Sequence, residues 1–119
     1  MWDLFCEVID NYGDIGVSWR LARILHAEHR IGMRLWVDDL AAFARIVPRA
    51  DPHAAAQTLD GIEVRHWAEP FPDAAPGEAV IEAFGCRLPE PYLAAMARRH
   101  PAPVWINLEY LTAEPWAAE

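Results

Sequence analysis

Short apolar runs alternate along this chain with segments of helical periodicity, and few folds accept that alternation. Runs typical of buried strands occupy residues 2–9, 33–37, 62–67, 79–84 and 104–110. Helical spacing predicts helices over residues 17–30, ended by Gly32, over 40–47, capped by Asp38 or Asp39, and over 89–99. Because parallel strands need such crossovers, we predict an α/β fold: a Rossmann-like open parallel sheet with helices on both faces and strand order 3-2-1-4-5.

Two further segments complete the predicted organisation. The Ala- and Gln-containing stretch before residue 62 has a weakly helical pattern, and residues 112–119 resemble the start of another helix with Thr112 as its cap. A chain of 119 residues fits a single domain. Since the last predicted helix is only beginning, we expect the natural chain to continue and this one to be an N-terminal fragment.

Composition argues against several functional classes. The formal net charge is −8 and all 10 basic residues are arginine, which argues against a nucleic-acid surface. No apolar run approaches the roughly 20 residues that span a bilayer, and no basic stretch precedes an apolar run at the N-terminus, so we expect a cytoplasmic protein without a membrane partner. Cys6 and Cys86 lie 80 positions apart without metal-ligand spacing. We therefore expect two reduced, buried thiols and no zinc site.

Residues 10–16, directly after the first predicted strand, carry the clearest functional signal. Ligands of an open parallel sheet bind beyond the carboxyl ends of its strands. Gly13 and Gly16 resemble part of a phosphate-binding loop, but Asp10 and Asp14 place negative charges where a phosphate would need donors. The loop therefore suits a positively charged ligand or proton abstraction. The alternative is purely local: Asp14 caps the helix and Asp10 closes the turn.

More acidic residues fall at the same predicted edge of the sheet. Asp38 and Asp39 follow the second strand, Glu82 lies in the fourth and Glu109 in the fifth. Together they would form an acidic crevice, although each one alone is more often a cap or a solvated charge. Carboxylates at such an edge also bind magnesium in other folds. No third ligand follows at a diagnostic spacing, so we predict no metal site.

Residues 10–23 read Asp-Asn-Tyr-Gly-Asp-Ile-Gly-Val-Ser-Trp-Arg-Leu-Ala-Arg. This segment resembles the N-terminal signature of the bacterial arginine rhamnosyltransferases that modify elongation factor P. Residues 35–40, 64–67, 81–86 and 105–111 are similar to the same family in the same order, so the resemblance covers essentially all 119 residues. It implies the N-terminal half of a GT-B glycosyltransferase, in which two Rossmann-like domains face a cleft.

The resemblance also implies an activity. Such an enzyme is an inverting glycosyltransferase that moves L-rhamnose from dTDP-β-L-rhamnose to one arginine of elongation factor P, which activates that factor for the rescue of ribosomes stalled at polyproline. Residues 1–119 would form the acceptor-binding domain, and a C-terminal domain absent from this chain would bind the sugar nucleotide, with no further cofactor. The family's essential aspartate pair falls on Asp10 and Asp14. Substrate contacts are expected from Asn11, Tyr12, Gly13, Gly16, Glu82 and Glu109.

The acidic loop and the implied reaction agree chemically. An arginine guanidinium has a pKa above about 12 and, while protonated, no lone pair for attack. One carboxylate can orient it through paired, charge-assisted hydrogen bonds while a second accepts its proton. We predict Asp14 as the general base and Asp10 as the orienting partner.

Two other functional classes stay open at this point. One is a non-catalytic acidic docking module for a basic protein partner. The other is a flavodoxin-like or receiver-like signalling domain whose clustered acids bind magnesium. A receiver should carry a lysine on its last strand, and this chain contains no lysine.

Overall fold

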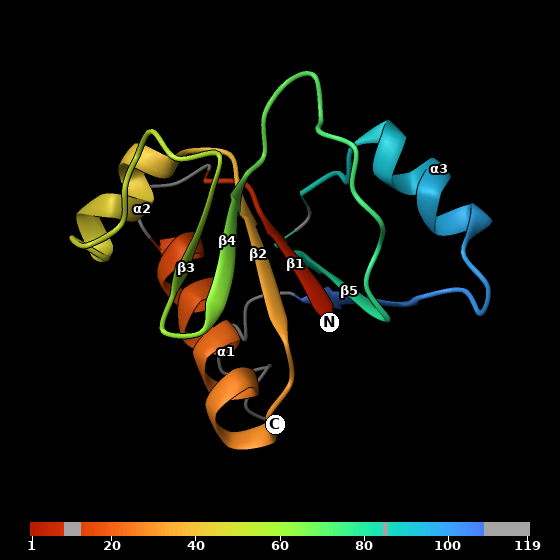
Figure 1. Cartoon of the computed structure of the whole chain (residues 1–119), viewed down its shortest axis with the longest axis horizontal. Helices are drawn as coiled ribbons and strands as arrows, with labels where there is room; N and C mark the ends of the chain where they lie inside the picture. The colour runs from red at the N-terminus through yellow and green to blue at the C-terminus, as the bar shows by residue number, and fades with distance from the viewer. Residues whose placement is uncertain (9–12, 85, 109–119) are drawn as a thin grey trace, which may run out of the picture.

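The computed structural model describes residues 1–8, 13–84 and 86–108. These residues form one six-stranded sheet with three helices (Figure 1). In chain order the elements are β1 (Trp2–Cys6), α1 (Gly13–His29), β2 (Met33–Val37), α2 (Leu40–Ile46), β3 (Ala56–Leu59), β4 (Ile62–His66), β5 (Ala79–Ala83), α3 (Glu90–Arg98) and β6 (Val104–Leu108).

The sheet has the order β3-β4-β2-β1-β5-β6, with β1 inside it. The pairs β1–β2, β1–β5, β2–β4 and β5–β6 are parallel. The predicted α/β class and the predicted order of the five parallel strands are therefore confirmed. All five parallel strands point their carboxyl ends toward one edge of the sheet, and α1 begins at that edge (Figure 1).

The sixth strand corrects the prediction of a weakly helical stretch before residue 62. Residues 56–59 form β3, which pairs antiparallel with β4. Asp60 and Gly61 join the two strands with φ angles of 52° and 79°, the left-handed geometry of a two-residue hairpin turn. A Cβ at Gly61 would lie 2.4 Å from Nε2 of His26. The Asp-Gly pair therefore decides the local structure, and it outweighs the helix preference of the preceding alanines.

Several element boundaries also differ from the sequence-based expectation. Helix α1 begins at Gly13 rather than at residue 17. The left-handed residue that ends it is Arg30, with φ 55°, and not Gly32. Strand β1 ends at Cys6, whereas the prediction extended to residue 9, which lies outside the described residues. Residues 109–110 of the last predicted strand and the helix expected from residue 112 also lie outside them.

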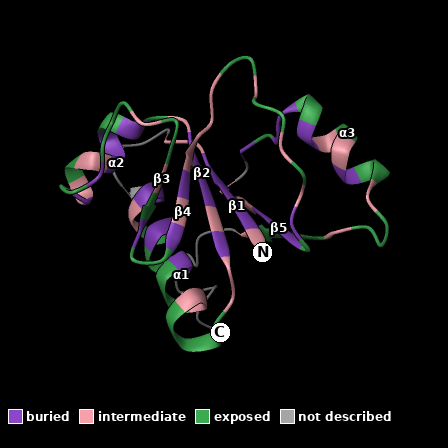
Figure 2. Ribbon diagram, viewed as in Figure 1, coloured by how far each residue is buried: buried purple, intermediate pink, exposed green. Residues whose placement is uncertain are grey.

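The helices cover both faces of the sheet, as predicted. On one face α1 and α2 pack over the strands, with Ile15, Trp19 and Phe43 in a cluster that includes Leu4 and Cys6 of β1. On the other face α3 covers an aromatic cluster. It contains Phe5, Trp36, Val80, Cys86, Leu88, Tyr92 and Met96. Successive residues of β1 thus serve opposite cores, and the inner strands are the most deeply buried part of the chain (Figure 2).

Strand β6 departs from the expectation that every apolar strand is buried. It lies at the edge of the sheet, and Val104, Trp105 and Ile106 are 62%, 54% and 37% exposed. These three apolar side chains therefore lie largely outside the core formed by the described residues. None of the described helices is long and apolar enough to cross a membrane.

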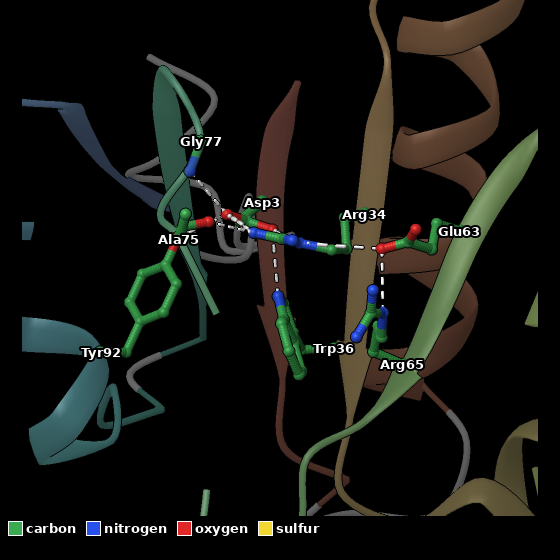
Figure 3. A network of polar contacts seen from close by, with 8 residues as sticks. All are labelled: Asp3, Arg34, Trp36, Glu63, Arg65, Ala75, Gly77 and Tyr92. Atoms are coloured by element: carbon green, nitrogen blue, oxygen red, sulfur yellow. Dashed lines mark hydrogen bonds and ion pairs between the residues drawn. The ribbon is translucent and has the colours of Figure 1, made fainter. Parts of the chain in front are cut away.

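A buried carboxylate that the sequence analysis did not single out holds the aromatic side of the sheet together (Figure 3). Asp3 is 0% exposed. It accepts hydrogen bonds from Nε and Nη2 of Arg34, from Nε1 of Trp36 at 3.0 Å, from the backbone N–H of Gly77 at 2.8 Å and from the hydroxyl of Tyr92. Burial raises the pKa of Tyr92 and the charge of Asp3 raises it further, so the hydroxyl stays protonated and donates.

These bonds tie distant parts of the chain to β1. Arg34 comes from β2 and also donates to the carbonyl oxygen of Ala75 at 2.6 Å, in the crossover between β4 and β5. Tyr92 comes from α3. Asp3 is the second residue of β1, so the network lies near the amino ends of the strands. It is a structural anchor at the edge opposite the predicted site.

Both cysteines are free and buried, as expected. Cys6 belongs to the core under α1 and α2, and Cys86 to the core under α3, so the sheet separates them. Burial raises the pKa of each thiol to about 12. We expect a thiol reagent at mildly alkaline pH to label neither cysteine in the folded protein and both after unfolding without reductant. Fewer than two thiols in the unfolded, unreduced protein would contradict this prediction.

Candidate active site at the carboxyl ends of the strands

The described part of the chain contains half of the predicted site residues. Asp14, Gly13 and Gly16 belong to the first turn and a half of α1, and Glu82 belongs to β5. The other predicted site residues lie outside the described residues. They are Asp10, Asn11, Tyr12 and Glu109.

Asp14 is the second residue of α1 and is 5% exposed. At this position a carboxylate is stabilised by the positive end of the helix dipole and by the unpaired N–H groups of the first turn. The neighbouring strand ends in Cys6, whose thiol pKa is raised by burial first and then by the charges of Asp14, Asp38 and Glu7. Asp14 and Asp38 therefore lie within electrostatic range of one buried thiol at the carboxyl end of β1.

Asp38 and Asp39 follow β2 directly but have different partners. Oδ1 of Asp38 accepts a hydrogen bond from the backbone N–H of Val8 at 2.8 Å. Burial raises the pKa of the Asp38 carboxyl group, and the hydrogen bond from Val8 opposes that shift. Oδ1 of Asp39 accepts from the N–H of Ala42 at 3.0 Å and caps α2. The cap predicted at one of these two positions is thus Asp39, while Asp38 binds the backbone of Val8, two residues after the end of β1.

Glu82 lies away from this pair of carboxylates. It is in register with Phe5, so its side chain is on the face covered by α3. Its Oε1 accepts a hydrogen bond from Nε1 of Trp105 at 3.0 Å. The described residues therefore place Asp14 and Asp38 at the carboxyl edge, each within electrostatic range of Cys6, and leave the Glu82 side chain on the other face of the sheet. An acceptor contact at Glu82 stays a prediction.

Gly16 in the first turn of α1 is not required by packing. A Cβ placed on it would meet no atom within 4 Å. Gly13 is the first residue of the helix. Among the described residues, no group of three or more histidine, cysteine or carboxylate side chains could hold a metal ion.

At this edge the sequence did not reveal the hydrogen-bond partner of Asp38, and Ser18 was missed altogether. Asp38 was considered only as one member of an acidic crevice, because its bond to Val8 spans 30 positions and depends on the alignment of β1 with β2. Ser18 is one turn after Asp14, and its side chain is fully buried. Its hydroxyl lies beside the Cys6 thiol, and the polar contact between them lowers the thiol pKa. The four-residue spacing of Asp14 and Ser18 was the available signal.

Comparison with known proteins gives a consistent result. The family model described as elongation factor P (EF-P) rhamnosyltransferase EarP matches residues 2–119. A protein-arginine rhamnosyltransferase of Pseudomonas aeruginosa is 60% identical over 115 residues, which cover 97% of this chain and 31% of that protein. The protein of the same name from Pseudomonas putida is 56% identical over 115 residues, which cover 97% of this chain and 30% of that protein.

A more distant relative agrees with these two. The protein-arginine rhamnosyltransferase of Neisseria meningitidis serogroup B is 47% identical over 114 residues, which cover 93% of this chain and 29% of that protein. The similarity thus extends along almost the whole chain. The chain itself spans less than a third of the length of the relatives it matches.

Proposed function

The chain belongs to the EarP family of elongation factor P rhamnosyltransferases, and on that premise we propose that it forms the acceptor-binding part of an inverting protein-arginine rhamnosyltransferase. The donor is dTDP-β-L-rhamnose and the acceptor is one arginine of elongation factor P, whose modification supports translation of polyproline in the cytoplasm. The relatives' shared name supports transfer of rhamnose to arginine.

One structural observation carries the proposal. Asp14 is buried at the start of α1, at the carboxyl edge of the parallel strands, and Asp38 follows β2 at the same edge. Ligands of an open parallel sheet bind at this edge. A guanidinium substrate needs a carboxylate that can pair with it and remove a proton, because its protonated nitrogens carry no lone pair. Carboxylates at this edge have the right charge for that substrate.

The reaction requires separate roles for Asp10 and Asp14. Asp10 pairs with the guanidinium through charge-assisted hydrogen bonds and orients one nitrogen. That nitrogen attacks the anomeric carbon of rhamnose while its proton passes to Asp14, and the bond between the anomeric carbon and the dTDP oxygen breaks with its electron pair leaving on dTDP. A single displacement inverts the β-linked donor to an α-linked product.

The division of labour between the two halves of the enzyme follows from the charges. We assign the acceptor to residues 1–119, with contacts from Asn11, Tyr12, Gly13, Gly16, Glu82 and Glu109. The donor carries a pyrophosphate, which needs backbone or cationic donors and is repelled by a loop that contains Asp10 and Asp14. We therefore assign the donor to the part of the enzyme beyond this chain, and no cofactor takes part.

Calorimetry with separate ligands tests this assignment. Residues 1–119 should bind elongation factor P weakly and show no saturable binding of dTDP-rhamnose, whereas the full-length enzyme should bind the donor. The control is elongation factor P with its acceptor arginine replaced by methionine, which should bind less tightly because the cation is lost. Saturable binding of dTDP-rhamnose to residues 1–119 alone would place the donor site in this domain and contradict the assignment.

A further inference from the structure

We propose that Asp38 is a positioning residue for the transfer reaction: its carboxylate holds the backbone of Val8 and thereby sets where the loop of Asp10 leaves the sheet. The proposal rests on the proposed function, in which Asp10 and Asp14 act on the acceptor. Asp38 itself touches no substrate in this scheme. It acts through Val8, which precedes Asp10 by two residues in the sequence.

The contact joins two strand ends at the functional edge. Cys6 of β1 is in register with Val37 of β2, which are the last residues of the two strands. The bond from the Val8 N–H to Oδ1 of Asp38, 2.8 Å long, continues this alignment one step beyond the sheet. Val8 is the last described residue before the loop that carries Asp10. The described residues that flank residues 9–12 are thus Val8, held by Asp38, and Gly13, the first residue of α1.

Asp38 is itself held in place. Its carbonyl oxygen accepts a hydrogen bond from Nε2 of His66, at the end of β4, at 3.2 Å. The carbonyl oxygen of Val37, one residue earlier, accepts from the N–H of Trp67 at 2.8 Å. One residue later, Asp39 caps α2. Three contacts, two from the end of β4 and one from the start of α2, therefore fix the turn that presents the Asp38 carboxylate to Val8.

The surroundings of the Asp38 side chain disfavour its ionised form. Burial raises the pKa of the Asp38 carboxyl group, and the charge of Asp39 adds to this shift. The hydrogen bond from the N–H of Val8 lowers the same pKa. The contact with Val8 therefore offsets part of the cost of burying a carboxylate at this position.

The consequence for the reaction follows from geometry. A displacement of about 1 Å in a reacting group can cost about 10²-fold in rate. Without the Asp38 acceptor, the N–H of Val8 loses its partner, and the backbone two residues before Asp10 in the sequence is less firmly held. We therefore expect removal of this acceptor to reduce kcat while the fold is retained.

In the full-length enzyme, variants of Asp38 can be compared with a variant of its neighbour Asp39 in the same turn after β2. Asp38→Ala removes the acceptor of the Val8 N–H, and we expect kcat to fall by roughly 10- to 10²-fold. Asp38→Asn retains an oxygen that can accept the same bond, so its kcat should stay within about threefold of the wild type, as expected when position rather than charge matters. Asp39→Ala removes the neighbouring carboxylate, which caps α2 and does not touch Val8, so its kcat should be unchanged.

Amide hydrogen exchange gives a readout that does not depend on activity. In Asp38→Ala the amide of Val8 should exchange faster, while in Asp39→Ala and Asp38→Asn its protection should match the wild type. A thermal melt of each variant confirms that the comparison is made on folded protein.

The outcomes separate the two proposals. If Asp38→Ala keeps both wild-type kcat and wild-type protection of Val8, Asp38 holds nothing and the inference is overturned. If Asp38→Asn is as slow as Asp38→Ala, the charge matters rather than the hydrogen bond, and the positioning role is equally overturned. If the wild-type enzyme transfers no rhamnose, the proposed function fails, and exchange at Val8 still decides whether Asp38 holds the loop.

Discussion

Replacing Asp14 with Asn in the full-length enzyme is expected to lower kcat by about 10²- to 10⁴-fold, the usual cost of losing a general base. Asn has nearly the same shape as Asp, so it can remain at the buried start of α1, where Asp14 is 5% exposed. It cannot accept the proton that leaves the guanidinium. Steady-state transfer of rhamnose to elongation factor P, measured with both substrates varied, should show the effect mainly in kcat.

The companion variant Asp10→Asn separates orientation from proton transfer. Loss of the charge that pairs with the guanidinium should raise the KM for elongation factor P and lower kcat as well. Neither variant should change the affinity for dTDP-rhamnose. Asp39→Asn is a matched control, since it removes a neighbouring charge but keeps an effective helix cap. If Asp10→Asn and Asp14→Asn both transfer rhamnose at the wild-type rate, these residues only close the turn and cap the helix.

The parallel sheet was predictable because its strands are separated by helices or by a long crossover. Such connections between parallel strands are almost always right-handed, which leaves few possible topologies. The antiparallel β3 was missed although its signal was present. Asp60 and Gly61 form the Asp-Gly pair that favours a two-residue hairpin turn, but the alanines before it resemble a helix. Local turn geometry determined the outcome there, and periodicity alone could not reveal it.

The site shows a similar division. Asp14 was predictable because it follows the first strand of an α/β unit, where the helix starts at the functional edge. The partner of Asp38 was not, because the bond to Val8 joins residues 30 positions apart and requires the register of β1 and β2. The role of Asp3 could not be predicted for the same reason. Its hydrogen-bond donors lie between 31 and 89 positions away in the sequence, and only the folded chain brings them together.

Those donors make Asp3 the position where we expect the largest loss of stability. Asp3 is fully buried, and the side chain of its ion-pair partner Arg34 is only 12% exposed. Removing one member of a buried pair leaves an uncompensated charge, which costs about 3–5 kcal/mol. In Asp3→Asn one acceptor oxygen becomes an NH2 donor, so the donors on Trp36, Gly77 and Tyr92 cannot all keep their acceptor. The polar links that join the crossover and α3 to β1 would then be weakened.

Urea denaturation of Asp3→Asn measures this loss against a surface ion pair. Asn preserves the size of the side chain, so the change reports the missing charge and the altered hydrogen bonds rather than a cavity. Arg23→Ala is the control, because Arg23 and Asp60 form a pair 3.7 Å long with side chains 59% and 39% exposed, and such pairs contribute at most about 1 kcal/mol. If Asp3→Asn lowers the free energy of unfolding no more than Arg23→Ala does, the Asp3 network does not anchor the fold. A loss several times larger in Asp3→Asn would show that one carboxylate near the amino ends of the strands stabilises the sheet whose opposite edge carries the proposed active site.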